Sequence, residues 1–202
     1  METEFTTQDK KWIQNTIRET YSKAAKGPKG LFNYPTGHEG LTALKYDPEL
    51  LQALPPDVAA SYCGVGNPFT LGLINAGDAV LDVGCGAGVD TLFSAMITGP
   101  SGKVVGIDLT PAMLERAKKN LSMTDLKNVA FKEGSVENLP FADEDFNIVT
   151  SNGALNLVPD KAKAFAEICR VLKPGGRLMV ADLILTGKLP KEKDKIIKSW
   201  AQ

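Results

Sequence analysis

The sequence predicts an α/β fold in which a doubly wound, mostly parallel sheet carries helices on both faces. From residue 79 onward, short apolar segments of strand length alternate with segments of helical periodicity. This alternation gives parallel strands joined by right-handed crossovers. A glycine-rich loop directly follows the first strand, where a fold of this kind binds its ligand.

Five strands are expected, at Ala79–Val83, Lys103–Asp108, Val129–Glu133, 146–150 and 177–185. Helices are expected at 90–98, Pro111–Leu121 and 160–172. Thr110 is placed to cap the second of these, with Pro111 at the first helical position. The segment KPGG at 173–176 is a helix stop and turn.

The first 75 residues have a different pattern and predict an appendage that caps the site, whereas residues 76–202 form the core. Residues 8–25 form an amphipathic helix with Trp12, Ile13, Ile17 and Tyr21 on one stripe. Residues 26–40 hold four glycines and two prolines, which predicts a loop. A short helix opens at Asp47-Pro48 and ends at Pro55-Pro56; a turn at 61–68 and a short helix at 69–74 follow.

Composition excludes several classes of protein. Apolar residues make up 43% of the 202 residues, the net charge is −1, and Lys and Arg are scattered. These values indicate a soluble globular chain without the charge pattern of a nucleic-acid or membrane partner. No transmembrane run or signal peptide is present, and the three cysteines lack paired spacing. We therefore expect a cytoplasmic protein.

The loop after the first strand predicts the cofactor. Residues 82–88 read D-x-G-x-G-x-G, and glycines there let the backbone approach a ligand. Asp108 ends the second strand, where an acid can accept hydrogen bonds from both ribose hydroxyls of a nucleoside. A dinucleotide-binding loop has a further glycine at the position that Val89 occupies here. S-adenosylmethionine (SAM) has no pyrophosphate, and Asp82 can meet its ammonium group.

Four segments together resemble successive motifs of class I SAM-dependent methyltransferases: VLDVGCGAGVDT, VVGIDLTPAML, GSVENLPFADEDFNIVTSN and EICRVLKPGGRLMVAD. The resemblance covers residues 78–185 and implies a Rossmann-like fold, with SAM as cofactor and S-adenosylhomocysteine as product. It implies that Asp108 binds the ribose, that Leu109 and Met113 flank the adenine, that residues 135–137 follow its edge, and that Asn152 lies beside the sulfonium. The expected cofactor residues are Asp82, Gly84, Cys85, Gly86, Gly88, Asp108, Leu109, Met113, Ser135, Val136, Glu137 and Asn152.

Residues 61–68 (SYCGVGNP) and 151–161 (SNGALNLVPDK) resemble the arsenite methyltransferase branch more closely. That branch binds trivalent arsenic through several cysteines, but this chain has Val65 and Gly153 at two of those positions. Cys63 is alone, Cys85 lies in the glycine loop, and Cys169 is expected in the core. No metal site is predicted. The sequence therefore indicates a SAM-dependent methyltransferase with a different small-molecule acceptor; arsenite methylation and a non-catalytic SAM-binding module are the alternatives.

The sequence offers only weak catalytic candidates, His38 in the loop before the pocket and Tyr62. The charged stretch 188–198 is expected to be a solvated helix face. The chain stops within what should be that last helix, so the C-terminal hairpin strands of the family are expected to be missing. The fifth strand would then be an exposed edge, through which a homodimer could form.

Overall fold

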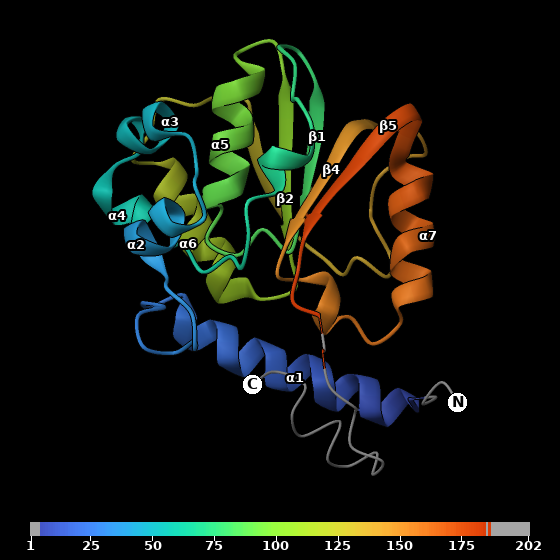
Figure 1. Cartoon of the computed structure of the whole chain (residues 1–202). Helices are drawn as coiled ribbons and strands as arrows, with labels where there is room; N and C mark the ends of the chain where they lie inside the picture. Colours follow the sequence, from blue (N-terminus) through green and yellow to red (C-terminus); the bar gives the residue numbers. More distant parts are fainter. Residues whose placement is uncertain (1–4, 185, 187–202) are drawn as a thin grey trace.

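A five-stranded sheet forms the centre of the computed structural model, which describes residues 5–184 and 186 (Figure 1). The strands are β1 (Ala79–Val83), β2 (Lys103–Asp108), β3 (Val129–Glu133), β4 (Phe146–Asn152) and β5 (Leu172–Ala181). They lie in the order β3-β2-β1-β4-β5, and every neighbouring pair is parallel. The chain winds outward from β1 to β3 and then crosses to β4, so the winding direction reverses between β1 and β4.

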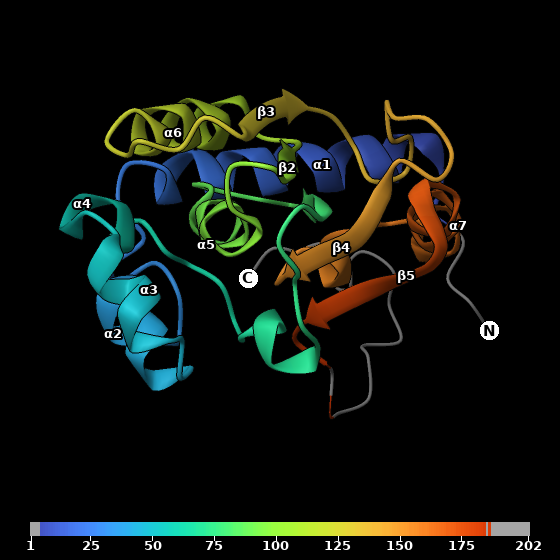
Figure 2. The ribbon, with the colours of Figure 1, turned by 90° about the horizontal axis from the view of Figure 1, so that it is seen from above.

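Helices cover both faces of the sheet, as the sequence predicts. Helices α5 (Val89–Thr98) and α6 (Pro111–Leu121) lie on one side, and α7 (Lys161–Val171) lies on the other (Figure 2). Successive strand residues point to opposite faces. Val80 of β1 therefore packs in one cluster with Ala95 of α5, whereas Leu81 packs in another with Ile168 of α7.

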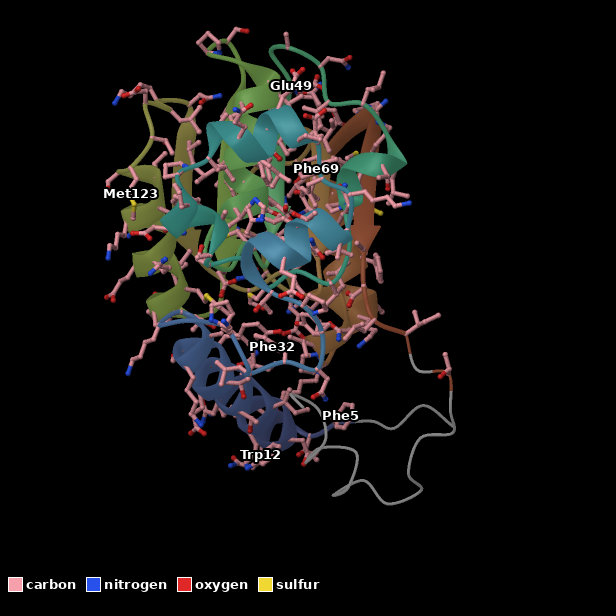
Figure 3. All side chains as sticks on the ribbon, turned by 60° about the vertical axis from the view of Figure 1, so that its left-hand side comes forward. Phe5, Trp12, Phe32, Glu49, Phe69 and Met123 are labelled. Carbon is pink, nitrogen blue, oxygen red and sulfur yellow. The ribbon has the colours of Figure 1, made fainter. Side chains whose placement is uncertain are left out.

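The N-terminal segment places a long helix across the carboxyl ends of the strands (Figure 1). This helix, α1 (Thr7–Ala24), begins at a capping box in which Thr6 and Asp9 bond each other's backbone N–H. It is tied to the core by the ion pair between Lys10 and Asp160, 3.0 Å apart. In Figure 3, Trp12 points away from the core and Phe32 lies between α1 and the rest of the fold. No helix among the described residues is long and apolar enough to cross a membrane.

The prediction of a loop over 26–40 was wrong at its end, because α2 (Gly37–Ala43) begins there. Two of the glycines that suggested a loop, Gly37 and Gly40, lie in this helix and pack closely against neighbouring backbone instead. A Cβ on Gly40 would lie 2.5 Å from the carbonyl oxygen of Pro35. Helix α3 (Pro48–Ala53) follows as expected, but Pro56 opens a further helix, α4 (Pro56–Ala59), since proline suits a first helical position. The next short helix is a 3₁₀ turn, η1 (Pro68–Leu71).

The predicted turn at 173–176 lies inside strand β5. Leu172 already pairs with Phe146, and regular pairing resumes at Arg177 opposite Ile148. The residues between them bulge out, with Gly175 at φ +77°. The strand ends at Ala181, earlier than expected. The stretch 188–198 and the expected last helix lie outside the described residues.

Two further predictions need correction. Cys169 is exposed rather than in the core. The buried face of α7 carries Ala164, Ile168 and Val171, and Cys169, which directly follows Ile168, points away from that face. Thr110 does stand at the N-cap of α6, but its side chain makes no capping bond. The Asp108 carboxylate instead accepts from the Thr110 backbone N–H at 2.8 Å.

Candidate functional site

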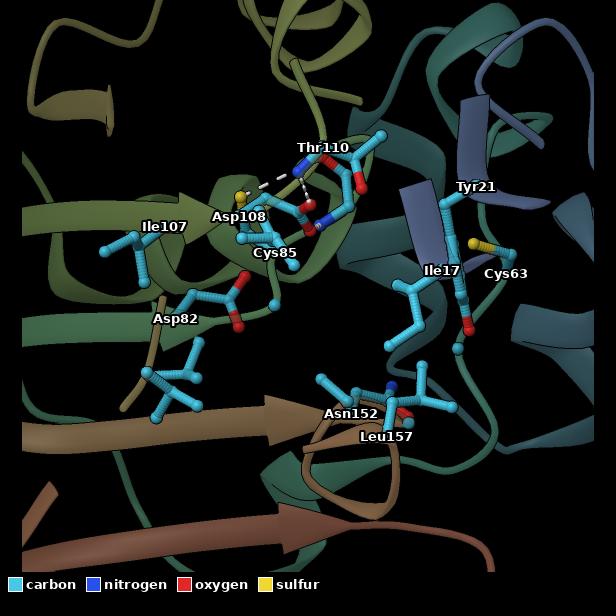
Figure 4. Close-up of a pocket in the computed structure, with 18 of the residues that line it drawn as sticks. Ile17, Tyr21, Cys63, Asp82, Cys85, Ile107, Asp108, Thr110, Asn152 and Leu157 are labelled. Carbon is cyan, nitrogen blue, oxygen red and sulfur yellow. Dashed lines mark hydrogen bonds between the residues drawn. The ribbon is translucent and has the colours of Figure 1, made fainter. Parts of the chain in front are cut away.

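A pocket opens at the carboxyl ends of β1, β2 and β4, where the winding direction reverses and where ligands bind in sheets of this kind. Figure 4 shows two walls facing each other across it. Asp82, Cys85 and Asp108 lie on the core wall, and Ile17, Tyr21 and Cys63 come from the N-terminal segment. The pocket is therefore built jointly by the sheet and the first third of the chain.

The glycine loop forms the floor of the pocket in a conformation that side chains resist. Gly84, Gly86 and Gly88 have φ of +69°, +52° and +82°. A Cβ on Gly86 would meet no atom within 4 Å, so this glycine leaves open space on the pocket side. Gly84 faces the Ala154 side chain. Gly88 lies against Phe131 and Ala117, where it allows close packing between elements.

Asp108 ends β2 with its carboxylate fixed by two backbone amides. The N–H groups of Gly86 and Thr110 donate to its two oxygens at 2.9 and 2.8 Å. Burial raises the pKa of this carboxyl, and the two amide bonds oppose that rise. Each oxygen keeps a lone pair for a ligand hydroxyl.

Two more carboxylates are buried beside the loop. Asp82 accepts from the Thr91 hydroxyl at 2.6 Å and from the Thr150 hydroxyl at 3.0 Å. Asp90, in the first turn of α5, accepts from the Tyr46 hydroxyl and from the Asn152 amide, both at 2.8 Å. Burial raises the pKa of Asp82 to about 6 and, together with the nearby charge of Asp82, raises that of Asp90 to about 7.

The pocket has a one-sided charge. Its described lining includes Asp82, Asp90, Asp108 and Glu137, but no Lys, Arg or His. The described residues place no basic side chain within ion-pair distance of these four carboxylates. A positively charged ligand would supply the charge that the protein does not.

A polar network joins the core to the N-terminal wall. The Asn152 side-chain oxygen accepts from the N–H groups of Val65 and Gly66 at 2.9 and 3.0 Å. Its amide nitrogen lies 2.8 Å from both Asp90 Oδ2 and the Gly66 carbonyl. The Tyr62 hydroxyl donates to that same carbonyl at 2.8 Å. This network fixes the turn at 61–66 against the end of β4.

A methyltransferase-domain family model matches residues 74–202. The chain belongs to this family. Curated relatives and a solved structure confirm the resemblance that the sequence motifs carried. The arsenite methyltransferase of Halobacterium salinarum is 38% identical over 82% of this chain and 42% of its own length. The demethylmenaquinone methyltransferase of Lactobacillus johnsonii is 40% identical over 54% of this chain and 45% of its own.

Among solved structures, an arsenic(III) S-adenosylmethionine methyltransferase from Chlamydomonas reinhardtii superposes on this methyltransferase-family chain with a TM-score of 0.59. The two are 31% identical over 78% of this chain and 52% of the other. The chain thus spans about half the length of the relatives it matches.

Most of the residues that the sequence predicts for the cofactor line this pocket in the methyltransferase fold: Asp82, Gly84, Cys85, Gly86, Asp108, Leu109, Ser135, Val136, Glu137 and Asn152. Gly88 and Met113 do not line it. Met113 is buried against Ala24 and Ala87. Glu137 already bonds the Asp160 N–H at 3.1 Å and approaches Gln14 at 3.5 Å.

The two weak catalytic candidates occupy different places. Tyr62 lines the pocket, but His38 lies on α2 near Thr42 and Lys45, in a separate depression. Sequence reasoning also missed Asp90. Its position was a signal, because a residue in the first helical turn after a glycine loop lies next to the ligand that the loop binds. An acid is also common in a first helical turn for a structural reason, since it interacts favourably with the helix dipole.

Proposed function

We propose that this chain binds SAM in the pocket and transfers its methyl group to a small-molecule acceptor. The charge of the pocket carries the proposal. Bound SAM presents a sulfonium and an ammonium to carboxylates that lack a basic partner in the protein. A dinucleotide would instead bring a pyrophosphate toward Asp82, Asp90 and Asp108 without any described Lys or Arg in the lining to receive it.

The shape of the site agrees with this ligand. Asp108 would bind the ribose hydroxyls through the lone pairs that its amide partners leave free. Leu109 and residues 135–137 would line the adenine. The open space at Gly86 would admit the cofactor, and Asp82 would face the methionyl ammonium.

The protein's contribution to the reaction is placement. SAM supplies the activated methyl group. We propose that residues 1–75 act as a cap, because Ile17, Tyr21 and Cys63 of this segment line the pocket opposite the glycine loop. Such a cap would hold the acceptor in line with the methyl group and keep water out. Orientation of this kind contributes about 7–11 kcal/mol to barrier lowering in well-aligned reactions.

The acceptor is proposed to be organic, although relatives include arsenite methyltransferases. A soft metalloid requires several thiolates. Cys63 lines the pocket, Cys85 is buried in the glycine loop, and Cys169 is exposed on α7. At the two positions where the arsenite branch has cysteines, this chain has Val65 and Gly153. The two residues are neighbours in the structure, since a Cβ on Gly153 would lie 3.2 Å from the Val65 side chain.

Transfer of a radiolabelled methyl group from SAM tests this function directly. The panel contains phenols, hydroquinones, amines, small thiols and arsenite with a thiol reductant. We expect labelled organic product and little methylated arsenic. Arsenite turnover that is lost in Cys63→Ser would contradict the acceptor class. SAM binding without transfer to any acceptor would instead support the non-catalytic module.

A further inference from the structure

We propose that Asp90 is the general base of the reaction, and that the acceptor atom is an oxygen or carbon that carries a proton. This inference rests on the proposed methyltransferase function. It begins from the different surroundings of the three pocket aspartates. Backbone amides hold Asp108, and two threonine hydroxyls hold Asp82. Asp90 alone is bonded to Asn152 and Tyr46, on the side where the N-terminal segment meets the end of β4.

The Asp90 carboxylate is arranged to accept a proton. Each oxygen receives a hydrogen bond from a neutral donor, one from Tyr46 and one from Asn152, and keeps a second lone pair. Both donors fix the orientation of the carboxylate. No Lys, Arg or His in the described lining of the pocket would hold it permanently ionised. Burial brings its pKa to about 7, close to the value that suits a base at neutral pH.

Other groups near the pocket are less suited to this role. The Tyr62 hydroxyl donates to the Gly66 carbonyl, and burial raises its pKa far above the usual tyrosine value. Burial likewise raises the pKa of the Cys63 thiol to about 12. His38 does not line the pocket.

The charge changes of the reaction favour proton uptake at this position. A bond forms between the acceptor atom and the methyl carbon, the carbon–sulfur bond breaks, and its electron pair stays on sulfur. The acceptor's proton passes to a free Asp90 oxygen and later to solvent. Loss of the sulfonium charge removes a nearby cation, which raises the proton affinity of the carboxylate as the proton is released. Asp90 thereby takes up one positive charge in the step that consumes another.

An experiment without an acceptor tests the carboxylate itself. The protein, labelled with carboxyl-¹³C aspartate and bound to S-adenosylhomocysteine, is titrated by NMR, and Asp90→Asn identifies the resonance. We expect Asp90 to titrate near neutral pH. Titration near the usual aspartate pKa of about 4 would overturn the assignment, because such a carboxylate is too weak a base.

A second experiment compares Asp90→Asn with Asp57→Asn, which removes an exposed carboxylate on α4. Asparagine retains the size of the side chain and can still bond Asn152. We expect Asp90→Asn to lower kcat for a hydroquinone or phenol probe, measured at saturating SAM, about 100-fold or more, and to abolish the rising limb of the pH profile. The Asp57 variant should behave as wild type.

Three results separate the possible failures. An unchanged kcat in Asp90→Asn, or transfer only to thiols, would overturn the base assignment while leaving the proposed function intact. A loss of SAM affinity that accounts for the whole effect would also overturn it. No transfer by the wild-type protein to any acceptor, with SAM bound, would contradict the proposed function and the base assignment together.

Discussion

At the residue scale, Asp108 connects cofactor binding to the glycine loop. Its oxygens accept from the Gly86 and Thr110 amides, so the same carboxylate orders the loop and faces the pocket. Asp108→Ala would leave both amides without their partner, and its effect on SAM would be mixed with an effect on the loop. Asparagine retains the volume and one acceptor oxygen, which makes it the cleaner substitution.

We expect Asp108→Asn to weaken SAM binding about 100-fold or more. The loss of charge-assisted hydrogen bonds costs about 3 kcal/mol, and 1.4 kcal/mol is a factor of ten in affinity. Calorimetry measures the affinity, and circular dichroism checks that the fold survives. An unchanged affinity would rule out the ribose assignment.

Gly86 offers a second residue-scale test, with Gly99 as a matched control. Both have positive φ and open space at the Cβ position, but only Gly86 lines the pocket. Valine at either position brings similar backbone strain. Gly86→Val should abolish SAM binding by filling cofactor space, whereas Gly99→Val should lower stability alone. Normal binding by Gly86→Val would mean that the loop is only a structural turn.

At the scale of elements, Asn152 fixes the 61–66 turn to the end of β4. Asn152→Leu would leave the half-buried amides of Val65 and Gly66 without their acceptor, and would remove one of the two donors to the Asp90 carboxylate. We expect a loss of about 2 kcal/mol or more in the free energy of unfolding, measured with urea. Hydrogen exchange should quicken at the Val65 and Gly66 amides. Unchanged exchange there would show that other contacts hold the turn.

The sequence predicted the elements of the core better than the pieces that complete the site. The bounds of β1, β2 and β3 were predicted correctly. Strands β1 and β2 are buried parallel strands, whose apolar runs are a local signature. Helix α2 was missed because its glycines suggest a loop, whereas Gly37 packs against Ala60 and Gly40 against Tyr62, about 20 residues further along the chain. The position of α1 over the strand ends, and with it the Tyr21 wall, depends on tertiary docking.

At the scale of the whole molecule, three pocket carboxylates without basic partners make stability depend on pH. Their native pKa values lie above the unfolded values, so the native state binds more protons than the unfolded state between about pH 4 and pH 7. Their contribution to stability is therefore present at low pH and is lost as pH rises through this window.

We expect the melting temperature of the ligand-free protein to fall from pH 5.5 to pH 8, and SAM affinity to rise over the same range as the carboxylates ionise. Differential scanning calorimetry measures the first and titration calorimetry the second. Asp82→Asn should flatten the stability profile, since it removes one of these charges. A melting temperature that rises toward pH 8 in the wild type would show that the buried acids do not dominate.

Strand β5 lies at an edge of the described sheet, so we still predict that the chain self-associates through this edge. Light scattering over a range of protein concentrations tests it. A monomer at all concentrations would contradict pairing through this edge.

The central claim is that an acidic pocket at the reversal of the sheet binds a cationic nucleoside cofactor. Titration calorimetry of the protein with SAM and with NAD⁺, at pH 7.5 and the same salt concentration, tests it most directly. The structure predicts one SAM site per chain, with no measurable heat from NAD⁺. Equal or tighter binding of NAD⁺, or no binding of SAM, would contradict the account.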